Sequence, residues 1–308
     1  SNFDFDISNS VDLPLMLNNA TLTSCFVNCN AIVIDNVNNF DYFNISSTER
    51  MFESCTNLNQ DIIFTAINII NMSRMFSGCT NFNGLVTFNS TNVLEDVSYQ
   101  FENCSAYVGG GNLWTLAGEI TTFEGTFFNC FSLNRIITPN SPKLTNISAM
   151  FANCTSLNST VTFNSSLITT AENAFSGCTI FNQPIVLDCS EMLNMSEFFF
   201  RCTNFNSNVT FTNTNKLLTV RNFFFECTSL TSLPTTIWDN TSNIQNFDST
   251  FIRAINLNSP IELDCSSCTN MYRTFRECFK LAGSITLTNT SNVENFYETF
   301  FLQSLYSS

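Results

Sequence analysis

Residues 71–92 read NMSRMFSGCTNFNGLVTFNSTN, and this stretch decides the fold. Its first half carries apolar residues at the spacing of one helical face. These residues are Met72, Met75, Phe76 and Cys79. Asn71 stands just before them, where its side chain could cap the first free backbone N–H groups. Val86 and Phe88 follow two residues apart, which is the alternation of a short strand. The stretch therefore predicts a short helix followed by a short strand.

A Phe followed three residues later by a Cys recurs along the whole chain, at intervals of 24 to 27 residues. The pairs are Phe26/Cys29, Phe52/Cys55, Phe76/Cys79, Phe101/Cys104, Phe127/Cys130, Phe151/Cys154, Phe175/Cys178, Phe199/Cys202, Phe224/Cys227 and Phe275/Cys278. Phe251 and Phe300 keep the register, with Ala254 and Gln303 in the Cys position. A fixed period of this length is typical of a solenoid built from stacked supersecondary units.

These repeats predict one architecture for residues 1–308. We expect a single leucine-rich-repeat-like solenoid of the α/β class, with about twelve coils of 24–27 residues and one short parallel strand in each coil. The repeats run from about residue 25 to residue 303. If the helical piece is too short to form, an all-β solenoid with a rise of about 4.8 Å is the alternative. Besides Val86/Phe88, the strand pairs are Ile62/Phe64, Val161/Phe163, Ile185/Leu187, Val209/Phe211, Ile261/Leu263 and Ile285/Leu287.

Three segments carry a resemblance to known families: NMSRMFSGCTNFN, NISAMFANCTSLN and AFSGCTIFNQPI. They resemble the BspA-like leucine-rich repeats, and they resemble even more the repeat of mycoplasma-type surface lipoproteins. The resemblance covers nearly the whole chain. It implies a surface-exposed solenoid with an adhesive or unassigned role, and it carries over no catalytic residue.

The charge balance argues against several classes of partner. The net charge is −14, and only 12% of the residues are charged. Phosphate binding needs a basic stripe, so we expect no nucleic acid and no binding to anionic membranes. No run of about 20 apolar residues is present, so we expect no membrane insertion. Because the chain opens on Ser1, we expect a processed protein that is extracellular or at the cell surface.

Ten of the fourteen cysteines hold the repeated position on the apolar face. We expect them to be buried free thiols, because coils about 10 Å apart would hold their Cα atoms beyond the 7 Å limit for a disulfide. Cys265 and Cys268 form a CxxC pair outside this series. Without a second CxxC or any His, zinc is disfavoured. A local disulfide and two free thiols remain the alternatives for this pair.

Many N-x-S/T sequons are present, and four of them lie in the polar turn after the strand. If the protein passes through a secretory pathway, these four are the accessible glycosylation candidates. They are Asn89, Asn164, Asn240 and Asn289.

Catalytic chemistry is missing from the sequence. The chain has no His, which removes imidazole catalysis and imidazole metal ligands. Asp188 and Asp264 hold equivalent positions three coils apart, too distant for paired acid–base work. We therefore expect no enzyme, no cofactor and no bound metal.

Two functions remain from these residues. The first is a structural subunit of a surface fibre or layer, a homo-oligomer assembled head-to-tail through uncapped ends such as Phe300 and Leu302. The alternative is a surface adhesion module that binds a host or cell-surface protein or a glycan. Monomeric rods would favour adhesion, and long filaments would favour the structural role.

Overall fold

A computed structural model describes residues 22–30, 45–64, 68–88, 92–110, 113, 118–139, 141–234 and 237–302. The chain divides into two compact units, Ser1–Leu157 and Asn158–Ser308, and each contains its own stack of repeats. We call each repeat a coil. The Phe that recurs once in each repeat is its ladder Phe, and the Cys three residues later is its ladder Cys. The turn side of a coil runs from five residues before the ladder Phe to three residues after it, and the remainder is the strand side. The single domain and the number of coils remain predictions from the sequence period.

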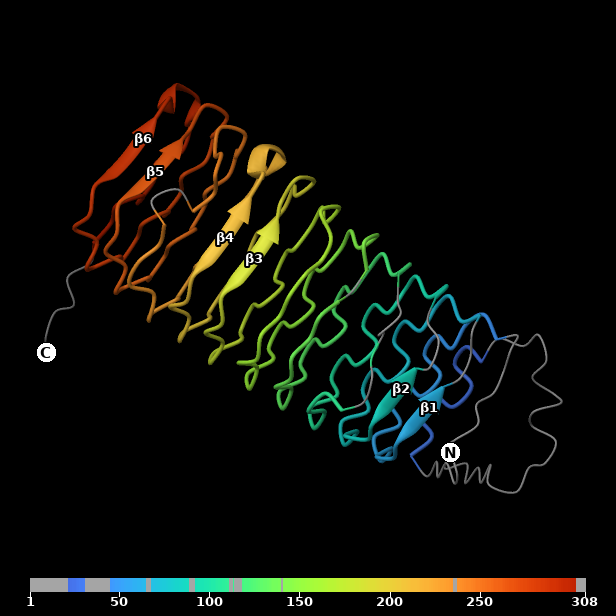
Figure 1. The fold of residues 1–308 in the computed structure, drawn as a ribbon. Helices are drawn as coiled ribbons and strands as arrows, with labels where there is room; N and C mark the ends of the chain where they lie inside the picture. Colours follow the sequence, from blue (N-terminus) through green and yellow to red (C-terminus); the bar gives the residue numbers. More distant parts are fainter. Residues whose placement is uncertain are drawn as a thin grey trace, which may run out of the picture. The chain divides into compact units, whose positions relative to one another are not determined.

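Six short strands lie on the strand sides (Figure 1). In the first unit, β1 (Ile62–Phe64) pairs in parallel with β2 (Val86–Phe88). In the second, β3 (Ile185–Asp188) pairs in parallel with β4 (Val209–Thr212), and β5 (Ile261–Asp264) pairs in parallel with β6 (Ile285–Thr288). The predicted strands are therefore confirmed at six positions. Val161 and Phe163 lie outside these strands.

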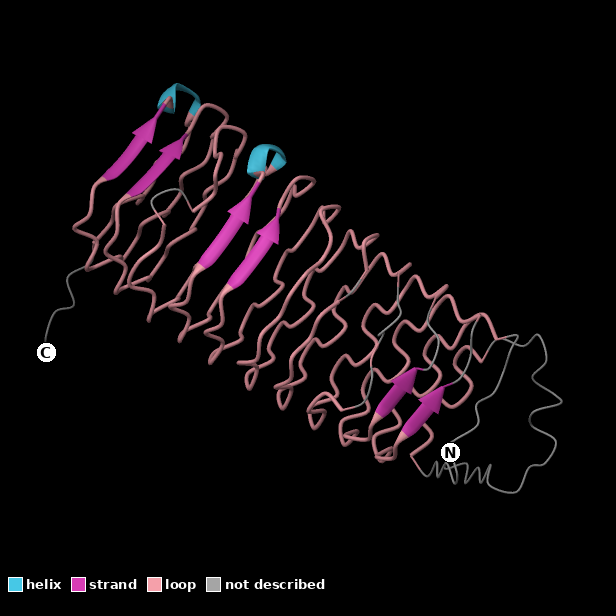
Figure 2. Cartoon of the chain, viewed as in Figure 1, coloured by secondary structure: helices cyan, strands magenta, loops and turns pink. Residues whose placement is uncertain are grey.

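The predicted helix around Phe76 is wrong. Arg74 has a φ of +53° and Gly78 a φ of +76°, and this left-handed conformation ends any helix. The Phe76 N–H donates to the carbonyl of Gln100 in the next coil at 2.8 Å, instead of to Met72. The helices of the described residues are two short 3-10 turns, η1 (Thr214–Lys216) and η2 (Thr290–Asn292) (Figure 2). The fold is thus built from turns and short parallel strands, closer to the all-β alternative than to the α/β class.

Left-handed residues recur two positions before and two positions after the ladder Phe. In the first unit they are Ser24, Asn28, Arg50, Ser54, Arg74, Gly78, Tyr99, Asn103, Gly125, Asn129, Ala149 and Asn153. In the second they are Asn173, Gly177, Glu197, Arg201, Asn222, Glu226, Ser249, Arg253, Arg273, Glu277 and Glu298. Side chains such as Ala and Glu adopt this conformation at a cost. The surrounding coils must therefore hold the backbone in place.

Hydrogen bonds between coils supply that support. Arg50 and Phe52 each donate an N–H to the next coil at 2.9 Å, whereas Met51 between them donates to Thr48 within its own turn. This alternation places adjacent turn sides at the spacing of neighbouring β-strands, about 4.8 Å. The 10 Å separation expected from the sequence is therefore wrong. A helix would satisfy its own N–H groups, and these turns satisfy half of theirs through the neighbouring coil.

Asparagine side chains complete the backbone hydrogen bonding. Asn71 accepts from the N–H of Ser73 at 2.7 Å, so it caps a turn and not a helix. On the strand side, Asn158 Oδ1 accepts from the N–H of Asn182, and Asn182 Oδ1 accepts from that of Asn206, both at 2.8 Å. The Asn-rich composition therefore has a structural cause, because these amides link one coil to the next.

The repeated Phe residues stack on one another in a ladder within each unit. Successive ring centroids lie 5.3 to 5.7 Å apart from Phe26 to Phe151. They lie 5.2 to 5.8 Å apart from Phe175 to Phe300. Most of these rings are fully buried. Their burial is the main apolar contribution of the turn side to stability.

The ladder cysteines are free thiols, and nearly all are buried. Eight of them donate the S–H to the carbonyl of the ladder Phe one coil earlier, at 2.9 to 3.1 Å. The cysteines with this bond are Cys55, Cys79, Cys104, Cys130, Cys154, Cys202, Cys227 and Cys278. A repeat of about 4.8 Å exceeds the Cβ separation of about 3.5–4.5 Å that a disulfide needs. Cysteine therefore serves here as a small apolar residue with a weak donor.

Candidate binding site

The strand ladder of the second unit is interrupted after β4. Phe211 of β4 forms a parallel bridge with Trp238 in the next coil. Between Trp238 and β5 the backbone pairing stops. The Asp264 N–H instead donates to the Thr241 hydroxyl at 2.7 Å, and this hydroxyl donates to the Asp264 carbonyl at 3.2 Å. One side chain thus takes the place of a strand pair.

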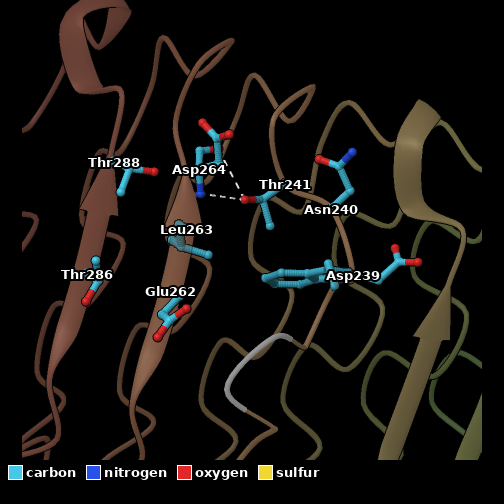
Figure 3. Close-up of a pocket in the computed structure, with 9 residues that line it drawn as sticks. Asp239, Asn240, Thr241, Glu262, Leu263, Asp264, Thr286 and Thr288 are labelled. Carbon is cyan, nitrogen blue, oxygen red and sulfur yellow. Dashed lines mark hydrogen bonds between the residues drawn. The ribbon is translucent and has the colours of Figure 1, made fainter.

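A hollow of about 280 Å³ opens at this interruption. We call it the Trp238 hollow. Glu262 and Asp264 of β5, with Thr286 and Thr288 of β6, line it from one face of the sheet (Figure 3), and Leu263 between them points to the core. The lining residues are Trp238, Asp239, Asn240, Thr241, Glu262, Leu263, Asp264, Thr286 and Thr288. The site is therefore polar, acidic and rich in hydroxyl groups.

Trp238 lines this hollow, but its ring packs in the core. Its side chain is 2% exposed and packs edge-on against Phe223, with ring centroids 5.4 Å apart. Its indole Nε1 has no hydrogen-bond partner, a property shared in the described residues with one other buried atom, Gln100 Oε1. A buried donor without a partner costs about 1–3 kcal/mol. The nitrogen is closed off from solvent, so this donor is an energetic cost of the core packing.

Two of the three carboxylates at the hollow are held by the fold. Burial alone would raise the pKa of Asp239, but hydrogen bonds from Thr214 and Asn213 outweigh it and lower the pKa. The pKa of Asp264 is lowered by hydrogen bonds from Ser266 and Asn289. These two carboxylates therefore stay ionised.

Glu262 differs from both of them. Its side chain is exposed, and no hydrogen bond or ion pair joins it to another described residue. It faces Thr286 in the register of β5 and β6. Glu262 is thus the carboxylate of the hollow that remains available to a ligand.

In the described part of the chain, including the three carboxylates of the hollow, no group of three or more His, Cys, Asp or Glu side chains is placed so that it could hold a metal ion. Within these same residues, no helix has the length and apolar character needed to cross a bilayer.

The predicted glycosylation residues lie in different coils. Asn89 falls outside the described residues. Asn164 is exposed, whereas Asn240 is half-buried, with its Nδ2 bonded to Asn215 at 2.7 Å and its Oδ1 to the Ser242 N–H at 2.9 Å. Asn289 donates to Asp264 at 3.0 Å. Asn164 and Asn289 are both exposed, and glycosylation itself stays a prediction.

Cys265 and Cys268 are brought together by one tight turn. The Cys268 N–H donates to the Cys265 carbonyl at 3.0 Å, and both side chains are buried thiols. A hydrogen bond with the Cys268 sulfur, together with burial, raises the pKa of Cys265. The proximity that a local disulfide requires is present, and the disulfide remains a prediction.

A second feature lies on the turn side of the last described coils. Tyr272 and Tyr297 stack with ring centroids 5.5 Å apart, and the Arg273 guanidinium lies 4.5 Å from the first ring and 5.9 Å from the second. Glu298 holds Arg273 by an ion pair of 2.9 Å. We call these four residues the Tyr–Arg cluster. Tyr297 is 58% exposed.

Sequence reasoning missed both features, although each left a signal. The interval from Phe224 to Phe251 is 27 residues, the longest in the chain, and the Trp238 hollow lies within it. Tyr272 and Tyr297 occupy the same repeat position 25 residues apart. An irregular interval and an aromatic residue at an outward position are both visible in the sequence once a repeat is aligned on itself.

Comparison with known proteins gave one family and one structure. A family model described as "Mycoplasma protein of unknown function, DUF285" matches residues 20–140, 121–238 and 218–307. No curated protein matches the chain. A crystal structure of a leucine rich cell surface protein from Faecalibacterium prausnitzii A2-165 is similar at 18% identity, covering 75% of this chain and 79% of that chain, with a TM-score of 0.43.

Proposed function

Since the chain belongs to the Mycoplasma-type DUF285 family, whose description assigns no function, we propose a role from its own surfaces. The protein is a non-enzymatic solenoid of about twelve coils that acts at the cell surface or outside the cell. It binds a protein or a glycan through outward side chains of residues 158–308. The surface location follows from the resemblance of its repeats to those of surface lipoproteins.

The Tyr–Arg cluster is the observation that carries this proposal. Tyr and Arg are enriched among the residues that dominate binding energy in protein interfaces. Here their geometry is arranged in advance, because Glu298 fixes Arg273 and Arg273 packs on both rings. A surface ordered before binding loses less side-chain entropy on association. The cluster is therefore suited to contact a partner.

The absence of His from the sequence supports a binding role over a catalytic one. The Phe and Cys ladders fill the interior of the turn side. Most arginines of the turn side are ion-paired with glutamates. Ion pairs of this exposed kind contribute little to stability. Their regular arrangement is better explained by the shape and charge pattern of a recognition surface.

Binding of the labelled chain to surfaces coated with mucin, fibronectin or laminin, and to a glycan array, tests the proposal. The double variant R273A/Y297A should bind at least about tenfold more weakly to whichever probe retains the parent chain. The matched control is R74A/Y99A, because Arg74 lies 4.5 Å above the Tyr99 ring in the first unit. Equal binding by the two double variants would contradict a role for the Tyr–Arg cluster. No retention of the parent chain on any probe would contradict the proposed function.

A head-to-tail filament subunit is the second candidate. In the coil of Phe300, four apolar side chains are exposed: Phe296 at 45%, Phe300 at 53%, Phe301 at 41% and Leu302 at 60%. β6 has a partner strand on one side, and a coil from a second copy could stack on the other. Electron microscopy of the purified chain separates the roles, because long filaments support assembly and monodisperse particles contradict it.

A further inference from the structure

We propose that Cys265 and Cys268 close to a disulfide when the chain meets a low-molecular-weight disulfide such as oxidised glutathione, so that the turn after β5 is a redox-sensitive staple. This inference goes beyond the proposed binding function and does not depend on it. Two observations carry it. One tight turn places the two thiols in contact, and the second thiol stands where the other coils bury a larger apolar side chain.

The backbone of this turn has the geometry that a disulfide requires. We call residues 264–268 the Cys turn. The Cys268 N–H donates to the Cys265 carbonyl at 3.0 Å, which is the hydrogen bond of a four-residue turn. Such a turn holds its end Cα atoms within about 7 Å, the range that a disulfide spans. The side chains also meet, because the Cys265 S–H donates to the Cys268 sulfur. Closure therefore requires no rearrangement of the coils.

A second turn in the same unit shows what this backbone needs. Residues 188–192, which we call the Met turn, follow β3 as the Cys turn follows β5. In both turns, the Ser at the third position donates its N–H at 3.0 Å and its hydroxyl at 2.6 Å to the Asp at the first. In both, the N–H of the fifth residue donates to the carbonyl of the Cys at the second position, at 3.0 Å. The fifth residue is Met192 in one turn and Cys268 in the other, so the fold forms this turn without a thiol there.

Packing does not explain the thiol of Cys268. The residue seven positions before the ladder Phe is a buried Ile or Leu in the coils of Phe52 to Phe151. In the second unit, the buried residues at this position are Ile168, Met192, Leu217 and Ile244. Cys268 is equally buried but fills less volume, which a close-packed core disfavours. Its sulfur lies 3.6 Å from the Asn270 carbonyl, a longer contact than those of the ladder thiols. The role of Cys268 therefore lies with its neighbour Cys265.

The two thiols differ in reactivity, and this sets the order of the exchange. The hydrogen bond from Cys265 lowers the pKa of Cys268 and raises that of Cys265. The Cys268 thiolate attacks one sulfur of the small disulfide, forms a mixed disulfide and releases one small thiolate. Cys265 then loses its proton and attacks the Cys268 sulfur, which releases the second thiolate. The protein thus loses two electrons and two protons, and the small disulfide becomes two thiols.

The interrupted strand pairing gives the oxidant a route to these buried sulfurs. On the side of β6, the Cys265 N–H bonds to the Thr288 carbonyl at 2.9 Å. On the other side, strand pairing stops, and the Cys turn is held by the Ser267 N–H bond to the Ser242 carbonyl at 3.1 Å and by the Thr241 hydroxyl. A local opening on that side breaks few backbone bonds, so it precedes the unfolding of the coils.

Mass spectrometry of the full chain tests the closure. The folded chain is incubated with oxidised glutathione, in buffer and in urea below the unfolding transition, and is then denatured, alkylated with iodoacetamide and cleaved with trypsin. The peptide of residues 254–273 contains Cys265 and Cys268 and no other cysteine. It should lack two hydrogen atoms and carry no alkyl group. Two alkyl groups on this peptide in both samples would overturn the proposal. A glutathione adduct in place of the internal disulfide would also overturn it.

Two variants separate the pair from the other thiols. C268M gives the Cys turn the residue of the Met turn, so it should fold and keep Cys265 free for alkylation. Oxidation should raise the melting temperature of the parent chain by about 2–4 °C, and dithiothreitol should reverse the rise. C268M should show no such shift, and an equal shift in C268M would contradict the staple. M192C places the same pair in the Met turn and should lose two further hydrogen atoms on oxidation. Failure of M192C to close would overturn the argument from turn geometry.

The outcomes leave the proposed function separately testable. Retention of the reduced parent chain on a coated surface, with loss in R273A/Y297A, would support that function even if residues 254–273 stay reduced. Closure of the disulfide in a chain that no probe retains would support the staple alone.

Discussion

The two sides of each coil obey different rules. On the turn side, the left-handed positions, the alternating N–H bonds and the S–H bonds to Phe carbonyls recur with little change. On the strand side, strands appear in three separate pairs, and the Trp238 hollow interrupts them. Variation in repeat length is therefore absorbed on the strand side. A site for function can arise there without disturbing the ladder that holds the coils together.

The difference has a physical cause. Every second N–H of the turn side finds its partner in the next coil, so an inserted residue would reverse the alternation and leave several donors unpaired. On the strand side, a side chain such as Thr241 can replace a backbone bond. Two consequences follow: substitutions should cost most on the turn side, and function should concentrate on the strand side or on outward-facing turn residues.

The largest expected effect is the loss of stability at high pH, because the turn side buries many thiols. Burial raises the pKa of the ladder thiols, to about 12 for Cys278, whereas a thiol in the unfolded chain ionises near 8.5. The other strongly affected thiols are Cys79, Cys104, Cys130, Cys202 and Cys227. Above that pH the unfolded chain loses protons that the folded chain retains, so the free energy of unfolding falls as pH rises.

Each such thiol should lower the free energy of unfolding by about 1.4 kcal/mol per pH unit between about pH 8.5 and 12. Six together give roughly 8 kcal/mol per unit, enough to unfold a domain of ordinary stability near pH 10. Urea unfolding at a series of pH values measures the slope. C104A should make the fall in the free energy of unfolding with pH less steep by about 1.4 kcal/mol per pH unit, the contribution of one thiol. A flat profile up to pH 11 would mean that the thiols are accessible in the folded chain.

Loss of a ladder ring should have the next largest effect. Phe101 is fully buried and stacks against Phe76 and Phe127, with centroids 5.3 and 5.6 Å away. Phe101→Ala should lower the free energy of unfolding by about 3–5 kcal/mol. Phe131→Ala is the matched control, because Phe131 is 45% exposed, and it should cost less than about 1 kcal/mol. Equal losses in the two variants would contradict the ladder as the main core.

One glycine sharpens the comparison on the strand side. A Cβ at Gly84 would lie 1.9 Å from the carbonyl oxygen of Gln60 in the preceding coil. Gly84→Ala must therefore push two coils apart and should cost about 1–3 kcal/mol. Gly118→Ala is the control, because a Cβ there meets no atom within 4 Å. Thermal melting compares them, and the same melting temperature for both variants would show that the strand side tolerates local separation of coils.

Sequence alone predicted the ladder and the strands but misjudged the backbone between them. The Phe and Cys positions follow from periodic burial, and Val86 and Phe88 follow from alternation. The segment around Phe76 has helical spacing because its turns repeat every three or four residues, as a helix does. The left-handed φ at Arg74 distinguishes these turns from a helix. Arg has no special preference for that conformation. The neighbouring coil imposes it through hydrogen bonds that no local pattern encodes.

The site was harder to predict for the same reason. Trp238, Glu262 and Thr286 are distant in sequence and meet because one coil is longer than its neighbours. Nothing in the local sequence of Glu262 separates it from an ordinary solvated strand residue. Only the register between coils makes it face Thr286. The long interval from Phe224 to Phe251 is visible in the sequence, but the structure is needed to show that pairing stops there and which side chains line the gap.

The smallest expected effect tests why the ladder uses cysteine. Ala254 occupies the Cys position of its coil, so the carbonyl of Phe224 accepts from the Cys227 N–H but receives no thiol from Ala254. Ala254→Cys should supply this donor and raise the free energy of unfolding by about 0.5–1 kcal/mol. Ala254→Val adds similar bulk without a donor and should be neutral or destabilising. Urea unfolding of both variants measures the difference. If Val stabilises the chain as much as Cys does, the ladder thiols act through volume alone, and the S–H bonds contribute nothing to the regularity of the turn side.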